Sequence, residues 1–358
     1  TIIFLLGSAA SAASWDMLSL IVFRGLQGLG AGAIMATVNT LAGDLYSIKE
    51  RAAVQGWLSS MWGISAIVGP LLGGFFAEYV TWRWIFLVNI PVGVLALALI
   101  GIFLHESFER RAHRIDYAGS LLVLLALALL IFGLMQGGAA WPWWSWQSGT
   151  LLLLVASFTG VLVRVERHAA EPILPGWLWR RRVLLGANLA TLAMGLVMMA
   201  PSVNLPTFLQ SVHGLGAIAA GLVLACISLG WPVASALSGR VYMRIGFRDA
   251  AFIGGVLIVL ASLAFIWMPQ PRPVWMVVLD QVALGAGFGL LSTPLLVGQQ
   301  SVVGWGQRGV VTSSNMFSRY LGQSLGAAAF GAIFNGTITR RLADAPAALA
   351  AQLPSGVD

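Results

Sequence analysis

Long apolar runs separated by short polar stretches recur along the whole chain. A helix that crosses a bilayer needs about 20 apolar residues, and these runs lack the strict alternation of transmembrane β-strands. The pattern predicts eleven membrane-spanning helices, at 1–15, 17–43, 53–77, 84–104, 117–136, 149–165, 183–209, 217–239, 250–269, 274–298 and 309–335. We therefore expect an all-α polytopic membrane protein.

The composition supports this interpretation and narrows the function. Hydrophobic residues make up 58% of the chain and charged residues only 9%, whereas a soluble domain carries about 25% charged residues. These values exclude a cytosolic enzyme, a nucleic-acid-binding protein and a disordered chain. The sequence has no GxxxxGK motif, no His or Cys cluster with metal-ligand spacing and no assignable catalytic set, so we expect neither an enzyme nor a metal or cofactor site.

The basic residues predict the orientation, because cytoplasmic loops of membrane proteins are enriched in Lys and Arg. With residue 1 on the cytoplasmic side, 14 of the 20 basic residues fall in cytoplasmic loops and only Arg83 and Arg272 in short outer loops. The outer loops carry tryptophans, which are typical of the membrane interface: Trp15, Trp82, Trp84, Trp141, Trp143, Trp144 and Trp146. We expect a multi-pass protein of the cell (inner) membrane.

The second predicted span contains an unusual polar pair. Arg24 lies inside the span, and Gln27 follows about one turn later on the same face. An intramembrane arginine is costly and typically functional, so both residues are candidates for transport or proton coupling. Alternatively, Arg24 extends to the outer surface or pairs with Asp16. The nearby Gly28 and Gly30 would let a neighbouring helix approach closely.

The third predicted span carries a proline within a group of glycines. Pro70 would remove a backbone hydrogen bond and bend the helix, while Gly69, Gly73 and Gly74 would form a face of small residues. A bend at such a packing seam suits a gating helix. Ordinary glycine-mediated helix packing explains the same residues equally well.

These two spans resemble a known family of transporters. The sequence Arg24-x-x-Gln27-Gly28-x-Gly30 resembles motif B of the major facilitator superfamily, and Gly69-Pro70-x-x-Gly73-Gly74 resembles its motif C, which marks antiporters. The stretches 82–93 and 115–119 are similar to parts of the fourteen-helix drug:proton antiporter branch, of the EmrB and QacA type.

The resemblance implies a particular domain organisation. Two helical bundles, 1–104 and 183–335, would flank a central two-helix insert at 105–182, and residues 336–358 would form an outer tail. In this alignment the eleven predicted spans match the third to thirteenth helices of the fourteen-helix branch. We therefore expect the first two helices and the last helix of such a transporter to lie outside this chain.

The loop that follows 217–239 resembles the second-half copy of the family's motif A, a cytoplasmic gating loop. Its candidate residues are Gly239, Arg240, Arg244, Gly246 and Arg248. Met243 stands where the motif usually has Asp, so a charge relay through that acid is not expected here.

Asp280 is the one acidic residue clearly inside a predicted span. A proton antiporter needs a membrane acid whose protonation competes with substrate, which makes Asp280 a candidate for proton coupling or substrate contact. It could instead be a structural acid bonded to a neighbour such as Arg24 or Arg319. Arg319, in the last span, is a further coupling candidate beside Gly322 and Gly326, which we interpret as a close-packing seam.

The span at 183–209 and its outer end supply candidates for a substrate path. Asn188, Met198, Asn204 and Gln210 combine polar groups with an adaptable thioether, and methionine surfaces suit varied apolar ligands. Core packing with polar contacts between helices is the alternative.

The implied function is secondary active efflux of drugs or lipophilic, often cationic, compounds in exchange for protons, by alternating access. The proton gradient would supply the energy, without a cofactor. The expected partners are the lipid bilayer, small-molecule substrates and protons, but not nucleic acid. Participation of a periplasmic adaptor protein is left open. The alternatives are a dedicated exporter of one native metabolite and an inactive truncated fragment.

Overall fold

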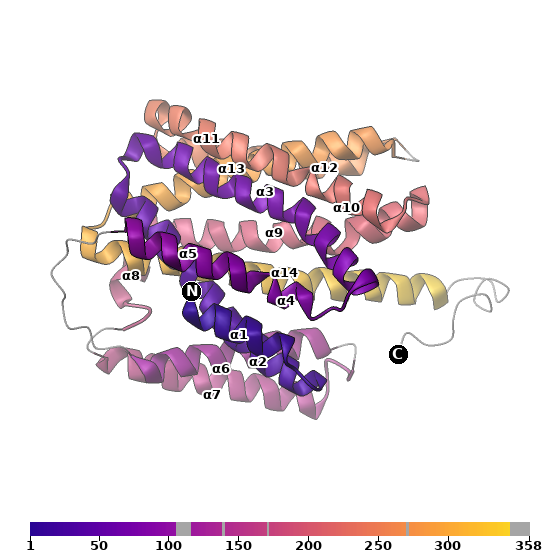
Figure 1. The fold of residues 1–358 in the computed structure, drawn as a ribbon, viewed down its shortest axis with the longest axis horizontal. Helices are drawn as coiled ribbons and strands as arrows, with labels where there is room; N and C mark the ends of the chain where they lie inside the picture. The colour runs from indigo at the N-terminus through magenta and orange to yellow at the C-terminus, as the bar shows by residue number, and fades with distance from the viewer. Residues whose placement is uncertain (105–115, 138–139, 170–171, 270–271, 344–358) are drawn as a thin grey trace. The chain divides into compact units, whose positions relative to one another are not determined.

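The computed structural model of the chain describes residues 1–104, 116–137, 140–169, 172–269 and 272–343, and it is built from helices (Figure 1). The helices are α1 Ile2–Ala12, α2 Met17–Leu45, α3 Ile48–Tyr79, α4 Trp84–Leu87, α5 Asn89–Phe103, α6 Tyr117–Gln136, α7 Trp146–His168, α8 Gly176–Arg180, α9 Arg182–His213, α10 Ala217–Ala225, α11 Ile227–Ile245, α12 Phe247–Trp267, α13 Val274–Ser301, η1 Trp305–Gln307 and α14 Arg308–Ala343. Among these residues there is no β-strand, only an isolated bridge between Gly137 and Trp141. The all-α prediction is confirmed.

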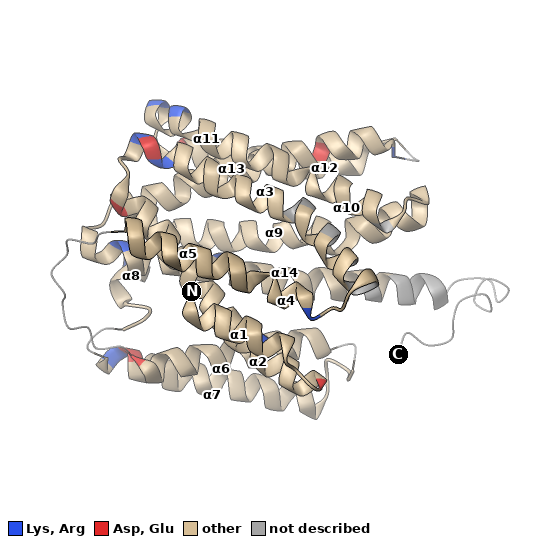
Figure 2. Ribbon diagram, in the orientation of Figure 1, with Lys and Arg blue, Asp and Glu red and all other residues tan. Residues whose placement is uncertain are grey.

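Each of the eleven predicted spans coincides with one helix or with two consecutive helices. Among the residues that the structure describes, eight helical segments are long and apolar enough to cross a membrane: Met17–Leu45, Trp84–Phe103, Tyr117–Gln136, Trp146–His168, Arg182–His213, Ile218–Ile245, Phe247–Trp267 and Val274–Ser301. In Figure 2 the charged residues gather towards helix ends, with long uncharged stretches between them. This arrangement is the one expected of a multi-pass membrane protein.

The chain divides into two compact units, and each unit is discontinuous in sequence. The first comprises Thr1–His113, Arg182–Ala187 and Gly216–Met316, and the second comprises Arg114–Arg181, Asn188–Leu215 and Phe317–Asp358. The predicted division into two bundles and a central insert stays a prediction.

In the first unit, α11 and α12 pack along α13, α11 also packs along α3, and α1 packs on α2. Glycines allow the backbones to approach closely, because a Cβ at Gly230 or Gly285 would collide with the facing carbonyl oxygen of Val282 or Ile227. Gly254 of α12 meets the backbone of α13 in the same way. Packing by small residues is the usual means of association where lipid replaces water.

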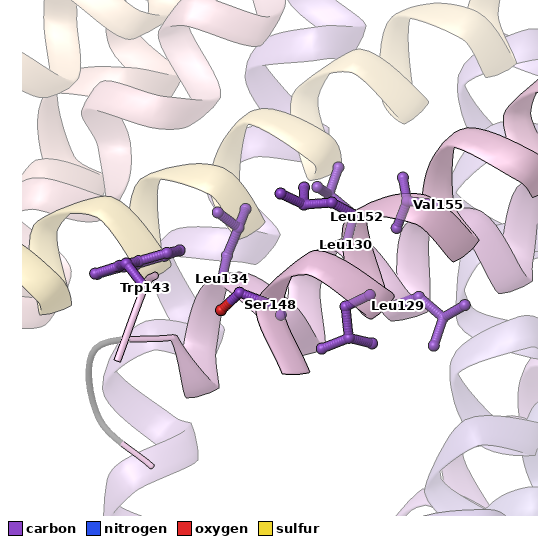
Figure 3. A pocket seen from close by; sticks show the side chains of 9 residues that line it. Leu129, Leu130, Leu134, Trp143, Ser148, Leu152 and Val155 are labelled. Carbon is purple, nitrogen blue, oxygen red and sulfur yellow. The ribbon is translucent and has the colours of Figure 1, made fainter. Parts of the chain in front are cut away.

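In the second unit, α6 and α7 form a hairpin, and α9 lies against α14. A Cβ on Gly322 or Gly326 would collide with the backbone of α9 at Leu192 or Leu196, so the close-packing seam predicted at these two glycines is confirmed. The hairpin carries a shallow, mostly apolar pocket at its surface, lined by Leu134, Leu152 and other leucines together with Trp143 (Figure 3).

The segment that follows 217–239, predicted as a gating loop, is helical in the structure, and its role in gating stays a prediction. Helix α11 continues through Arg240 and Arg244 to Ile245, and α12 begins at Phe247. Only Gly246 separates them, with a positive φ of 89° that favours glycine. The spacing of the arginines, four residues apart, is itself helical. Helix α14 likewise continues into the predicted tail as far as Ala343, and the rest of that tail lies outside the described residues.

Candidate functional site

The predicted pair in α2 belongs to a chain of hydrogen bonds that runs from the exposed Arg24 to buried side chains. Arg24 Nη1 donates to Gln27 Oε1 over 2.8 Å, and Gln27 Nε2 donates to Ser8 Oγ of α1 over 3.0 Å. Ser8 Oγ donates to the carbonyl oxygen of Phe86 over 2.9 Å, and Asn89 Nδ2 donates to Ser8 Oγ over 3.1 Å. Gln27 is only 3% exposed. The network therefore joins α1, α2 and the α4–α5 segment through the hydroxyl of Ser8.

The surroundings of Arg24 decide between its predicted alternatives. Its guanidinium lies over the ring of Phe86, 5.6 Å from the centroid. Asp16 instead caps the start of α2, where its carboxylate accepts a hydrogen bond from Ser19 N over 2.7 Å. That bond lowers the pKa of Asp16 below its ordinary value. In the described part of α2, Arg24 thus bonds to Gln27 rather than to Asp16.

The two glycines of the motif in α2 differ in their contacts. A Cβ on Gly30 would collide with the backbone of Phe4 in α1, so the close approach predicted there is confirmed. No described atom of the same unit lies within 4 Å of a Cβ built on Gly28, so the close approach predicted at that position is not seen in the described residues. Sequence reasoning missed Ser8 and Asn89, although Ser8 lies in a run of small residues in the first span.

The glycines of α3 that pack against another helix come earlier in the sequence than its proline motif. A Cβ on Gly63 would lie 2.9 Å from the carbonyl oxygen of Ser228, and one on Gly56 would lie 2.6 Å from Cβ of Ala236, both in α11. Gly69 and Gly73 contact no atom of their own unit within 4 Å. Gly56 and Gly63 therefore pack α3 on α11, and the role predicted for the small residues around Pro70 stays a prediction. Pro70 and Gly74 fall outside the residues whose surroundings are described.

Asp280 of α13 is buried, with 8% of its surface exposed. Its Oδ2 accepts a hydrogen bond from Gln281 Nε2 over 3.2 Å. Its Oδ1 and the Oε1 of Gln281 are buried without a hydrogen-bond partner. Two adjacent acceptors thus lack a donor in the apolar interior of the first unit, an arrangement that favours a proton, a cation or water.

The neighbouring helices bring no described cation into contact with Asp280. A Cβ on Gly287 of α13 would contact Ile258 of α12, and the two helices are antiparallel. Seven residues before Gly287 is Asp280, and seven residues after Ile258 is Phe265, so these two residues lie at a similar depth. Arg272 Nε donates to the carbonyl oxygen of Phe265 over 3.1 Å, and its guanidinium lies over that ring at 4.7 Å.

The other substrate and coupling candidates lie in the second unit. Met198 Sδ accepts a hydrogen bond from Gln323 Nε2 of α14 over 3.4 Å, and Asn188 is buried at 2% exposure. Asn204 Nδ2 donates to the carbonyl oxygen of Ala200 over 3.1 Å, while its Oδ1 is buried without a partner.

Two further candidates sit at different places in the same unit. Arg319 lies in α14 where the backbone of that helix contacts Gly195 of α9, and Gln210 is exposed near the end of α9. Sequence reasoning missed Gln323, which follows Gly322 on the packed side of α14.

A second polar cluster, also missed by sequence reasoning, lies between the end of α2 and the starts of α3 and α14. Arg308 Nη1 donates to Asp44 Oδ1 over 3.2 Å and to the carbonyl oxygen of Gly43 over 3.0 Å. Arg51 Nη2 donates to the same carbonyl oxygen, and Arg51 Nε donates to that of Tyr46 over 3.0 Å. Arg51 falls in the predicted cytoplasmic loop between the spans 17–43 and 53–77, but in the structure it is 5% exposed in the first turn of α3.

The end of α11 contacts the start of α3 beside this cluster. Tyr242 Oη donates to the carbonyl oxygen of Ile48 over 2.6 Å, and a Cβ on Gly239 would lie 2.6 Å from Cβ of Ala52. The candidate arginines Arg240, Arg244 and Arg248 are all exposed. The contact between α3 and α11 is thus made by the tyrosine and the glycine.

Comparisons with known proteins agree with the fold. Residues 1–327 match the Major Facilitator Superfamily. The chain is 31% identical over 356 residues to Multidrug resistance protein 3 of Bacillus subtilis (strain 168), covering 99% of the chain and 69% of that protein. It is 29% identical over 343 residues to the Multidrug transporter protein MdtP of the same strain, covering 96% of the chain and 63% of that protein.

A solved structure shows the same fold. The crystal structure of the human organic anion transporter MFSD10 (TETRAN) superposes with a TM-score of 0.64 at 17% identity, over 93% of the chain and 70% of that protein. The chain thus spans about two thirds of the length of these relatives. The relatives are transporters and not enzymes. Together with the match over residues 1–327, they show that the chain belongs to the Major Facilitator Superfamily of membrane transporters.

Proposed function

We propose that the chain works in proton-coupled efflux of drugs or other lipophilic, often cationic, compounds by alternating access in the cell membrane. Two relatives that match most of the chain are named Multidrug resistance protein 3 and Multidrug transporter protein MdtP. The motifs in α2 and α3 resemble those of drug:proton antiporters. The chemistry of a carboxyl in α13 supports the same function.

The observation that carries the proposal is the buried carboxyl of Asp280, whose Oδ1 has no hydrogen-bond partner. A carboxyl in apolar surroundings is stabilised by gaining a proton or by attracting a cation. These two ways of neutralising the charge exclude each other. Binding of a cationic substrate would therefore release the proton, and reprotonation would release the substrate, which is the exchange that an antiporter needs.

The charged residues of α10, α11 and α12, which pack against α13, do not neutralise Asp280, so a proton and a cationic substrate can compete for it. Arg240 and Arg244 of α11, and Arg248 and Asp249 of α12, lie at the opposite ends of their helices from the depth of Asp280. Helix α10 carries no charged residue. Arg272, the cation that precedes α13, is bonded to the backbone of Phe265.

The test measures the proton gradient of everted membrane vesicles that carry the chain. Addition of ethidium or tetraphenylphosphonium should dissipate part of a preformed gradient, as reported by a pH-sensitive dye. We expect Asp280→Asn, which keeps the shape of the side chain but cannot ionise, to lower the response to that of vesicles without the protein.

The matched control is Asp249→Asn, which removes an exposed carboxylate from the first turn of α12. It should respond like the wild type. A full response from Asp280→Asn would refute the role of Asp280, and no response from the wild-type chain would contradict proton-coupled efflux. A response to only one compound of a varied panel would favour a dedicated exporter.

A further inference from the structure

The cluster formed by Asp44, Arg51 and Arg308 contains more positive charge than its visible partners balance. The two guanidiniums share one carbonyl oxygen, that of Gly43, and Asp44 is the carboxylate that pairs with Arg308. Glu50, the other nearby acid, accepts hydrogen bonds from the backbone N and the Oγ of Ser47 at 3.0 and 2.7 Å. The cluster therefore carries a formal charge of about +1, from two arginines and one aspartate.

Two hydrogen-bond donors of the cluster also have no acceptor among the described residues. Arg51 Nη1 and Arg308 Nε are buried without a hydrogen-bond partner. Arg51 is almost fully buried, while the side chain of Arg308 keeps 24% of its surface exposed. An unbalanced, partly unbonded pair of guanidiniums is costly. An anion bound at the exposed edge of Arg308 would lower this cost. The positive charge of the buried Arg51 would also attract the anion.

The surroundings of the cluster indicate which anion would bind. The predicted orientation puts the α2–α3 junction and the start of α14 at the cytoplasmic face. Large apolar side chains remain exposed around the cluster, including Leu45 at 61% and Trp305 at 53%. Tyr46 and Val302 are exposed as well. Aromatic and aliphatic side chains next to arginines are typical of the membrane interface, where phosphate groups meet acyl chains.

We propose that Arg308 and Arg51 bind the phosphate of an anionic phospholipid from the cytoplasmic leaflet. Phosphate oxygens accept charge-assisted hydrogen bonds from guanidinium groups. The acyl chains of the lipid would lie along the exposed apolar side chains of the junction. The bound lipid would neutralise the cluster and thereby stabilise the connection of α2 and α3 to the start of α14. This proposal does not depend on which compounds the protein transports.

The test compares lipids with the purified chain in detergent. Native mass spectrometry measures retention of phosphatidylglycerol, phosphatidylethanolamine and phosphatidylcholine, and thermal unfolding measures stabilisation by each. We expect tighter binding of phosphatidylglycerol to the wild type, and about tenfold weaker binding to Arg308→Gln. Arg308→Lys should restore part of the affinity because it keeps the charge. Asp44→Asn should bind phosphatidylglycerol more tightly, since it removes the competing carboxylate.

The matched control is Arg167→Gln, which removes an exposed basic residue from the last turn of α7. It should keep the preference of the wild type for phosphatidylglycerol. Equal retention of all three lipids by the wild type, or equal phosphatidylglycerol binding by Arg308→Gln and the wild type, would overturn the proposal. Equal stabilisation by millimolar inorganic phosphate would also overturn it, because the ligand would then be a soluble anion.

Discussion

Gln27 links the guanidinium of Arg24 to the buried hydroxyl of Ser8. Its Oε1 accepts a hydrogen bond from Arg24, and its Nε2 donates one to Ser8. We expect Gln27→Leu to lower the free energy of unfolding by about 0.5–1.5 kcal/mol, because both hydrogen bonds are lost while Ser8 keeps its contacts with Phe86 and Asn89. Thermal unfolding in detergent would measure the loss.

Gln147→Leu offers a comparison for this substitution, since Gln147 is a partly exposed residue in the first turn of α7. Its stability should stay close to that of the wild type. Equal unfolding temperatures for the two variants would show that the hydrogen-bond chain through Gln27 contributes nothing measurable.

Only some of the polar residues in the two hydrogen-bonded clusters were predictable from the sequence. Arg24 and Gln27 were recognised because they interrupt an apolar run and are three residues apart. Ser8 and Asn89 were not, because they are 81 residues apart and only tertiary packing brings them together. The burial of Arg51 was not predicted, because hydropathy cannot tell a cation in water from one that folds back onto backbone carbonyls.

Among the elements, the contact between α11 and α13 depends on glycine at defined positions. Gly285→Ala would drive a Cβ into the carbonyl oxygen of Ile227, whereas a Cβ on Gly255 of α12 would meet no atom within 4 Å. Replacing Gly by Ala inside a helix stabilises it by about 1 kcal/mol when there is space. We therefore expect Gly255→Ala to raise the unfolding temperature and Gly285→Ala to lower it.

The two variants carry the same chemical change on packed helices, so we expect their unfolding temperatures to shift in opposite directions. A shift in the same direction for both variants would mean that α13 moves away from α11 at little cost. The close packing described for these helices would then not limit their stability.

The positions of the helices were predictable from the sequence, but the faces they turn towards each other were not. Apolar runs mark a helix wherever lipid or protein surrounds it, so every predicted span found its helix. The rotation of a helix about its axis depends on its neighbours. For that reason the sequence did not single out Gly56 and Gly63, the glycines through which α3 packs on α11 in the described part of the chain.

The membrane orientation is a property of the whole molecule, and it remains a prediction from the distribution of basic residues. A labelling experiment can test it at the two ends of α7. We expect Trp144→Cys, at a fully exposed position before α7, to react with a membrane-impermeant maleimide in intact cells. Arg167→Cys should react only after permeabilisation. Both changes are made in a Cys226→Ala background, because Cys226 is the one native cysteine.

The reverse labelling pattern would invert the predicted topology. It would also move the cluster of Asp44, Arg51 and Arg308 to the outer face, so the lipid proposed there would come from the other leaflet.

The two compact units were not predictable from the sequence, because each combines segments far apart in the chain, such as Thr1–His113 with Gly216–Met316.

The junction at Gly246 has a mechanical consequence. A single residue reaches at most about 3.6 Å, so α11 cannot slide along α12 by even one helical turn of about 5.4 Å without unwinding. The hydroxyl of Tyr242 also holds this end of α11 to α3. Any movement that shifts α11 along its axis would therefore carry α12 with it. The two helices would shift together, while Gly246 still allows the angle between them to change.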